Sequence, residues 1–266
     1  QIDQVLDLIH QYVNTGKNNA DEAAILVNSL FSQPNGLDIN KNVLVNYYDD
    51  NNEKKINYKT FQWEYNGKPI NNSISIIDKV ETDFGVEISV YQKASDGYWL
   101  ITPKSDKETP WFTYQKNLPI SLPEITKIEN GERYESVKEI NHQYVYYLCE
   151  PIWFKGELKG MLMVQHIMLD INALSASFKS ILSSENEYIS IVNKDGYFLY
   201  HPELMETMGD SYGFFKDLIK TGSEDSKIEF LWPENKTGRA KLQYSKFYQD
   251  LELYICIVYD IEILFK

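Results

Sequence analysis

A strand-turn-strand pattern that occurs twice constrains this chain more than any other feature. The copies occupy residues 86–103 (VEISVYQKASDGYWLITP) and 188–202 (YISIVNKDGYFLYHP). In each copy a run of β-branched and aromatic residues is followed by an Asp-Gly pair. This pair favours a tight hairpin turn because glycine accepts a positive φ. A second run then ends at a proline, which lacks a ladder donor. Since the copies lie farther apart than the roughly 20–50 residues of a solenoid repeat, we expect two similar α+β modules in series.

Composition narrows the class of protein. The 266 residues suffice for two cores, and the hydrophobic content of 43% with 14% aromatic residues excludes a disordered chain. The net charge is −13 and the only arginines are Arg133 and Arg239, so we expect no nucleic-acid partner. Cys149 and Cys256 lie in apolar runs and are expected to be buried free thiols, and no Cys/His cluster predicts a metal site.

Hydrophobic periodicity predicts the order of the elements. Apolar residues from Ile2 to Val13 recur on one helical face, a break is expected at residues 16–19, and Asn19 with Glu22 resembles a capping box that opens a second helix. Further helices are predicted at residues 72–83, 170–182 and 212–220. Strands are predicted at residues 43–49, 56–65, 134–140, 143–154, 157–166, 227–232, 240–247 and 252–259.

An ordered set of short motifs accompanies the two hairpins. It comprises residues 66–69 (NGKP) before 76–80 (IIDKV), residues 128–134 (IENGERY), and Gly196 with His201-Pro202 in the second copy. Together with the hairpins, this set resembles the double Cache domain, the extracytoplasmic sensor part of bacterial chemoreceptors, sensor histidine kinases and diguanylate cyclases. The resemblance covers essentially the whole chain.

The resemblance implies an α+β fold in which a long N-terminal helix precedes two tandem PAS-like antiparallel-sheet modules. It divides the chain into a helical stalk (residues 1–40), a membrane-distal module (41–169), a linking helix (170–184) and a membrane-proximal module (185–266). It also implies a homodimeric parent receptor, anchored in a membrane by helices outside this sequence, and a small-molecule pocket in the distal module. No run of about 18 apolar residues predicts a membrane span here.

The candidate pocket residues lie in and after the first hairpin. Many relatives have an arginine where this chain has Trp99, and a tryptophan offers stacking and one donor in place of a bidentate clamp for a carboxylate. Alternation puts Ile101 on the same face as Trp99, and Tyr144 and Tyr146 share a face of a later strand. Core packing for the tryptophan and cross-strand packing for the tyrosines remain the alternatives.

The long irregular segment at residues 104–123 supplies the remaining candidates. Trp111 and Tyr114 are candidates for a lid over the ligand, with core packing as the alternative. Lys104 follows the hairpin and is a candidate for meeting an anion, with a solvated lysine as the alternative. His201 has a catalytic or pH-sensing reading, but in this pattern it is expected to brace a turn.

These observations favour a ligand-sensing ectodomain that is not an enzyme. We predict no catalytic residues and no cofactor, because there is no Gly-x-Ser-x-Gly elbow and no glycine-rich phosphate loop. The alternatives are an ectodomain that docks a protein partner, which a large exposed apolar patch would favour, and a secreted enzyme, which would need converging titratable groups.

Overall fold

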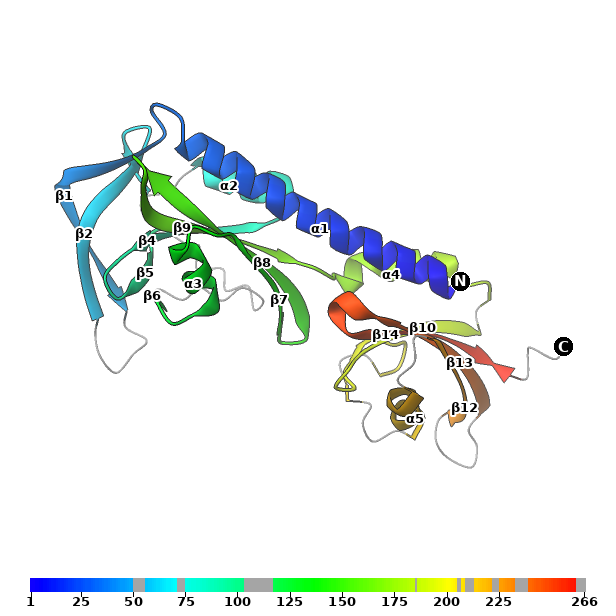
Figure 1. Cartoon of the computed structure of the whole chain (residues 1–266). Coiled ribbons are helices and arrows are strands. Elements are labelled where there is room, and N and C mark those ends of the chain that lie inside the picture. Colours follow the sequence, from blue (N-terminus) through cyan, green and yellow to red (C-terminus); the bar gives the residue numbers. More distant parts are fainter. Residues whose placement is uncertain are drawn as a thin grey trace. The chain divides into compact units, whose positions relative to one another are not determined.

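The computed structural model describes residues 1–49, 56–70, 75–102, 117–184, 186–204, 207–208, 213–221, 225–232 and 239–261. The chain forms two compact units, one made of Gln1–Val13 with Leu169–Lys266 and the other of Asn14–Met168. Each unit contains an antiparallel sheet with helices against it (Figure 1). The predicted α+β class, with a long N-terminal helix before two PAS-like modules, is confirmed.

The N-terminal helix α1 (Ile2–Phe31) is continuous, so the predicted break at residues 16–19 is wrong. Gly16 lies inside the helix, where an added Cβ would collide with the imidazole of His166. The glycine therefore permits close approach of the helix to a strand and does not end the helix. Asn19, predicted as a cap, lies in mid-helix and donates from Nδ2 to the carbonyl oxygen of Phe84 at 3.2 Å.

The unit Asn14–Met168 is built on a six-stranded sheet in the order β6-β5-β4-β9-β8-β7. Its strands are β4 (Glu87–Lys93), β5 (Gly97–Leu100), β6 (Asn117–Pro119), β7 (Tyr134–Ile140), β8 (Gln143–Phe154) and β9 (Glu157–Ile167). A separate three-stranded sheet contains β1 (Leu37–Asp49), β2 (Ile56–Tyr65) and β3 (Lys68–Pro69). Two short helices complete the unit, α2 (Ser75–Phe84) and α3 (Pro123–Glu129). The predicted bounds of β7, β8 and β9 hold to within one residue.

The two faces of the six-stranded sheet pack different helices, because successive side chains of a strand point to opposite sides. We call one side the α1 face: it carries His166 and Glu150, which contact α1. We call the other side the α3 face. There Tyr98, Tyr147 and neighbouring residues form a core with Ile125 and Ile128 of α3, and Figure 1 shows α1 and α3 on opposite sides of this sheet.

The second unit contains a five-stranded sheet in the order β11-β10-β14-β13-β12. Its strands are β10 (Glu187–Asn193), β11 (Phe198–Tyr200), β12 (Asp225–Trp232), β13 (Arg239–Tyr248) and β14 (Leu253–Asp260). The helix α4 (Ile171–Ile181) begins after Asp170, whose carboxylate accepts from the N–H of Ala173 at 3.1 Å, and α5 (Gly213–Thr221) covers an aromatic core. The register of β10 and β14 runs unbroken from Glu187 to Asn193.

The fold tests two expectations about individual side chains, one for the cysteines and one for His201. Cys149 and Cys256 are both buried and free, as predicted. His201 is buried and braces a turn, since its Nδ1 accepts the backbone N–H groups of Glu203 and Leu204, each at 3.0 Å. Burial lowers the pKa of His201 to about 4, so the imidazole is neutral at pH 7.

Candidate ligand-binding site

The described residues that were predicted to line the pocket lie on the α1 face. Trp99 has an exposed fraction of 0% and donates from Nε1 to the carboxylate of Asp96 at 3.2 Å, and Ile101 is also buried. Tyr144 and Tyr146 are buried on β8. Lys104, Trp111 and Tyr114 lie outside the described residues.

The sheet separates these residues. Trp99 is on β5 and Tyr146 is on β8, with β4 and β9 between them. Three strand spacings amount to roughly 14 Å. The structure therefore brings Tyr144 and Tyr146 together but does not join them to Trp99 in one cluster, and their role in ligand binding stays a prediction.

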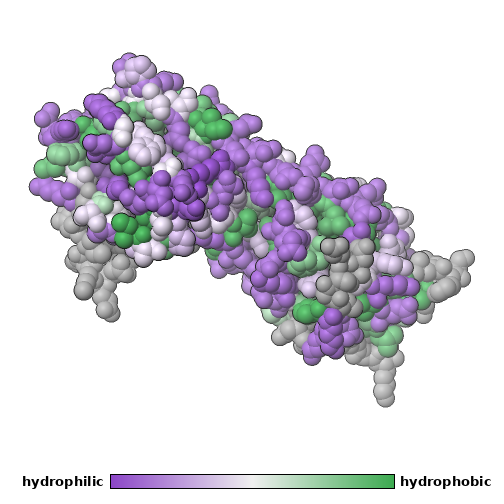
Figure 2. All heavy atoms as spheres, viewed as in Figure 1, coloured by the Kyte–Doolittle hydropathy of each residue, from purple (hydrophilic) through white to green (hydrophobic). Residues whose placement is uncertain are grey.

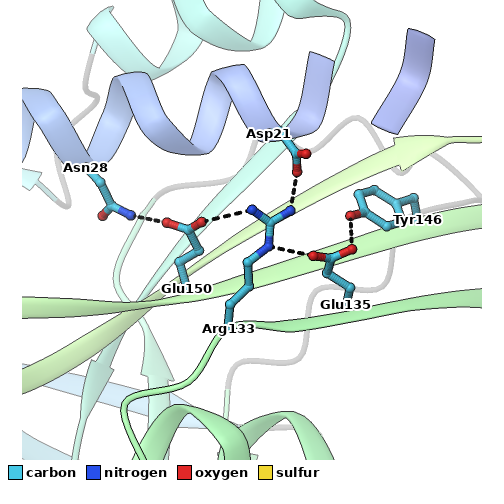
Figure 3. A network of polar contacts seen from close by, with 6 residues as sticks. All are labelled: Asp21, Asn28, Arg133, Glu135, Tyr146 and Glu150. Carbon is cyan, nitrogen blue, oxygen red and sulfur yellow. Dashed lines mark hydrogen bonds and ion pairs between the residues drawn. The ribbon is translucent and has the colours of Figure 1, made fainter. Parts of the chain in front are cut away.

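Tyr146 belongs to a polar network that joins the sheet to α1 (Figure 3). Its hydroxyl donates to Glu135 at 2.8 Å, and burial, followed by that hydrogen bond, raises its pKa. Arg133 binds Glu135 at 2.8 Å, contacts Glu150 at 3.5 Å and is ion-paired with Asp21 of α1. One guanidinium thus holds three carboxylates, two from the sheet and one from the helix.

Removing this cation is expected to loosen α1 from the sheet. Arg133→Gln should lower the free energy of unfolding by about 0.5–1.5 kcal/mol, since its side chain is 33% exposed and water screens the ion pairs. Urea denaturation followed by tryptophan fluorescence measures the change. Lys159→Gln is the control, because its ion pair with Glu157 joins two exposed side chains. Equal effects of the two substitutions would contradict a special role for Arg133.

The α3 face carries a group of buried polar atoms that no sequence argument singled out. On this face, four of the described residues have a buried side-chain oxygen or nitrogen without a well-formed hydrogen bond. They are Ser89 and Tyr91 of β4, Gln165 of β9 and Ser136 of β7, which we call the α3-face polar cluster. At Gln165 both ends of the carboxamide are unpaired.

The strand register places Ser89, Tyr91 and Gln165 on the adjacent strands β4 and β9, while Ser136 of β7 lies on the same face three strand spacings, roughly 14 Å, from β4. Gln165 pairs with Glu87 on one side and with Tyr147 on the other, and Tyr147 in turn pairs with Ser136. Ser89 lies one step along the same face of β4, opposite Met163. Directly opposed residues of an antiparallel pair share a face, with Cβ atoms roughly 4.5–5.5 Å apart.

Unpaired buried polar groups are costly. Each costs about 1–3 kcal/mol, and more than roughly nine in ten such groups find a partner in folded proteins. Burial is also the main cause that raises the pKa of Tyr91, so its hydroxyl stays protonated and can donate. Tyr91 lies close enough to Ser89 to interact with it, whereas the carboxamide of Gln165 has no partner among the described residues.

The charged residues beside the cluster are paired. Lys93 is ion-paired with Glu129, which also accepts from the hydroxyl of Tyr98 at 2.6 Å. Burial acts to raise the pKa of Glu129, but the hydrogen bonds from Lys93 and Tyr98 outweigh it, and the net pKa is lowered. Lys138 contacts Glu124 at 3.2 Å and lies over the ring of Tyr147 at 4.6 Å.

A weak sequence signal for the cluster exists. Ser89 is a polar residue between Ile88 and Val90, and Gln165 directly follows the apolar residues Met163 and Val164. Their grouping, however, depends on which strands are neighbours and in which register, and neither is encoded by a local pattern.

Two clefts lie elsewhere in the described residues. One, of about 540 Å³, is lined by residues around Gly36, Glu64 and Phe154, and the other, of about 550 Å³, lies between α4 and β10 beside Lys179 and Tyr188. Neither contains a predicted site residue, and no group of metal-binding side chains occurs among the residues that were described.

Comparison with protein families gives a match that spans nearly the entire chain. The Cache 3/Cache 2 fusion domain matches residues 1–262. This chain belongs to the Cache 3/Cache 2 fusion family. The expected double Cache architecture is thereby confirmed, and the chain is a sensory ectodomain and not a catalytic one. A search of curated proteins gives no match.

Solved structures similar to this Cache domain include three ligand-binding domains. The ligand-binding domain of the Pseudomonas aeruginosa PAO1 amino acid chemoreceptor PctC in complex with GABA is 13% identical, with 97% of this chain and 99% of that chain covered and a TM-score of 0.44. That of the Campylobacter jejuni chemoreceptor Tlp3 with L-valine is 14% identical, with 74% and 75% covered and a TM-score of 0.41. That of Mlp24 with asparagine is 14% identical, with 67% and 69% covered and a TM-score of 0.38.

Cache domains are extracytoplasmic sensor domains of membrane receptors. Among the described helices of this one, none is both long enough and apolar enough to cross a bilayer.

Proposed function

We propose that this Cache domain senses a small molecule in its distal module, residues 41–169, and that the ligand binds on the α3 face of the six-stranded sheet. The observation that carries the proposal is the α3-face polar cluster, in which both ends of the buried Gln165 carboxamide lack a partner among the described residues and Ser89, Tyr91 and Ser136 make no well-formed hydrogen bond. In this reading α3 packs against β7 and β8, and the ligand contacts β4 and β9 beside it. The helical stalk (1–40), linking helix (170–184) and proximal module (185–266) complete the sensor.

Signalling requires that the ligand have different affinities for two arrangements of the domain. The strand β8 offers a route, because Tyr147 lies on the α3 face while Tyr146 and Glu150 on the opposite face belong to the Arg133 network with α1. A shift of β8 on ligand binding would therefore change the contacts of α1. In the full receptor we place this sensor in a homodimer anchored by transmembrane helices.

The test is a thermal-shift screen of the chain against amino acids, small carboxylates, purines, polyamines and sugars. A ligand at a hundredfold excess over its Kd adds about 2.7 kcal/mol to the free energy of unfolding, which corresponds to a shift of several degrees in Tm. The double substitution Ser89→Ala with Tyr91→Phe should abolish the shift. Ser29→Ala, at an exposed position of α1, should not. No shift with any compound would overturn the proposal.

A protein-docking function is the second candidate. It is supported by Leu44 and Phe61, which pair across β1 and β2 with exposed fractions of 50% and 40%. The face drawn in Figure 2 is mainly hydrophilic, with scattered apolar side chains. Two residues make a small patch compared with a typical docking surface. The ligand-binding reading therefore has the stronger support.

A further inference from the structure

The most unusual member of the α3-face polar cluster is Gln165. Its exposed fraction is 0%, yet neither its Oε1 nor its Nε2 has a hydrogen-bond partner within the described chain. A carboxamide presents a C=O acceptor beside an N–H donor. A partner that pairs with both groups at once must place a hydrogen-bond donor opposite the C=O and an acceptor opposite the N–H. Another amide with its N–H and C=O on the same edge has this arrangement.

Two serine hydroxyls lie on the same face of the sheet as this carboxamide. Ser136 lies beyond Tyr147 in the same cross-strand row, and Ser89 is on the neighbouring strand β4. Neither hydroxyl makes a well-formed hydrogen bond within the described chain, although Ser89 lies close enough to Tyr91 to interact with it, and a hydroxyl donates or accepts as its partner requires. Ser89, on the strand next to Gln165, can therefore serve a further polar atom of the same ligand, while Met161 and Met163 provide an apolar surface beside it.

Among the described residues of this face, each basic side chain is already ion-paired, which disfavours a ligand that carries a carboxylate. Lys93 and Lys138 are ion-paired with Glu129 and Glu124. Arg133 is ion-paired with carboxylates on the opposite face of the sheet. Binding a carboxylate here would thus require breaking an existing ion pair, whereas an uncharged ligand leaves both in place.

We infer that the α3-face site takes an uncharged molecule with an amide edge, in which an N–H donor and a C=O acceptor lie side by side and pair with the carboxamide of Gln165. This inference rests on the proposed function, because it names the ligand class of the same site. The chemistry is shared by the lactam edge of a nucleobase and by an open primary carboxamide, which the experiment separates.

The experiment is calorimetric titration of the full 266-residue chain with two matched pairs of compounds. Nicotinamide and nicotinate differ in carboxamide against carboxylate, and hypoxanthine and purine differ in the lactam group. The amide-bearing member of a pair should bind at least about tenfold more tightly than its partner. Tighter binding of hypoxanthine identifies a nucleobase-type ligand, and tighter binding of nicotinamide identifies an open carboxamide.

Substitutions at position 165 complete the test. Gln165→Met keeps the length of the side chain but removes both hydrogen-bonding groups, so it should remove the preference for the amide. His142→Ala, at an exposed turn, is the control and should keep it. If no amide-bearing probe binds, the inference is overturned. Gln165 then holds ordered water only, and Gln165→Met should raise Tm.

Failure of the inference can be told apart from failure of the proposed function. If the chain binds a charged compound of the wider panel, and Gln165→Met leaves that affinity unchanged while Ser89→Ala with Tyr91→Phe abolishes it, the ligand class is wrong and the proposed function stands. If the chain binds nothing, both are overturned.

Discussion

Replacing Trp99 with alanine should lower the free energy of unfolding of the unit Asn14–Met168 by about 3–5 kcal/mol. The indole is completely buried on the α1 face, and its truncation leaves a cavity that the paired strands β4, β5 and β6 cannot readily close. Urea denaturation followed by tryptophan fluorescence measures the effect. Three of the described tryptophans, Trp63, Trp99 and Trp153, belong to this unit.

Trp153 provides the matched control. Its exposed fraction is 53%, so Trp153→Ala should cost less than about 1 kcal/mol. A similar cost for the two tryptophans would show that Trp99 is not the packing residue described above. Trp99→Phe keeps most of the volume and separates packing from binding. Because the proposed ligand site lies on the opposite face of the sheet, we expect this variant to fold and keep its ligand, and a loss of binding would instead support the predicted pocket role of Trp99.

Acidification from pH 7 to pH 5 should destabilise the second unit through His201. Burial lowers the pKa of this imidazole to about 4, below the value of about 6.5 expected in the unfolded chain. The neutral form is therefore favoured by folding, so the stabilisation is complete above pH 6.5 and is lost as pH falls toward 4. Linkage gives a loss of about 2 kcal/mol at pH 5.

His201→Asn isolates this contribution, because an asparagine oxygen can accept the N–H groups of Glu203 and Leu204 but does not titrate. Hydrogen exchange of β10 to β14 at pH 7 and pH 5, corrected for intrinsic rates, localises the effect. This local readout is needed because burial also lowers the pKa of His166 in the other unit. The same pH dependence in wild type and variant would contradict the assignment to His201.

Most elements of this fold could be predicted from local pattern. Strand-forming runs bounded by turn signals predict the three long strands from Tyr134 to Ile167 almost residue by residue, although only β7 alternates in burial and β8 and β9 are buried along most of their length. The predicted break in α1 is wrong because Gly16 is required by the close approach of the His166 imidazole. A local sequence pattern does not reveal such a tertiary contact. Strand β1 begins at Leu37 and not at residue 43, ahead of the register shift between Asn40 and Leu44.

The site was less predictable. Alternation correctly put Tyr144 and Tyr146 on one face, but it could not say which face packs α1 and which packs α3. Aromatic and charged residues are the usual candidates for a ligand site when only the sequence is known. The polar cluster consists instead of two serines, a tyrosine and a glutamine. Their significance comes from the absence of partners, which is a property of the folded packing.

The strand β8 sets a limit on how this domain can change length during evolution. Its residues alternate between Tyr147 and Cys149 on one face and Tyr146 and Glu150 on the other. Inserting or deleting one residue in mid-strand would exchange the two sets, whereas a change of two would restore them. Single-residue insertions in relatives should therefore fall in the flanking turns at residues 141–142 and 155–156, where the backbone already adopts positive φ.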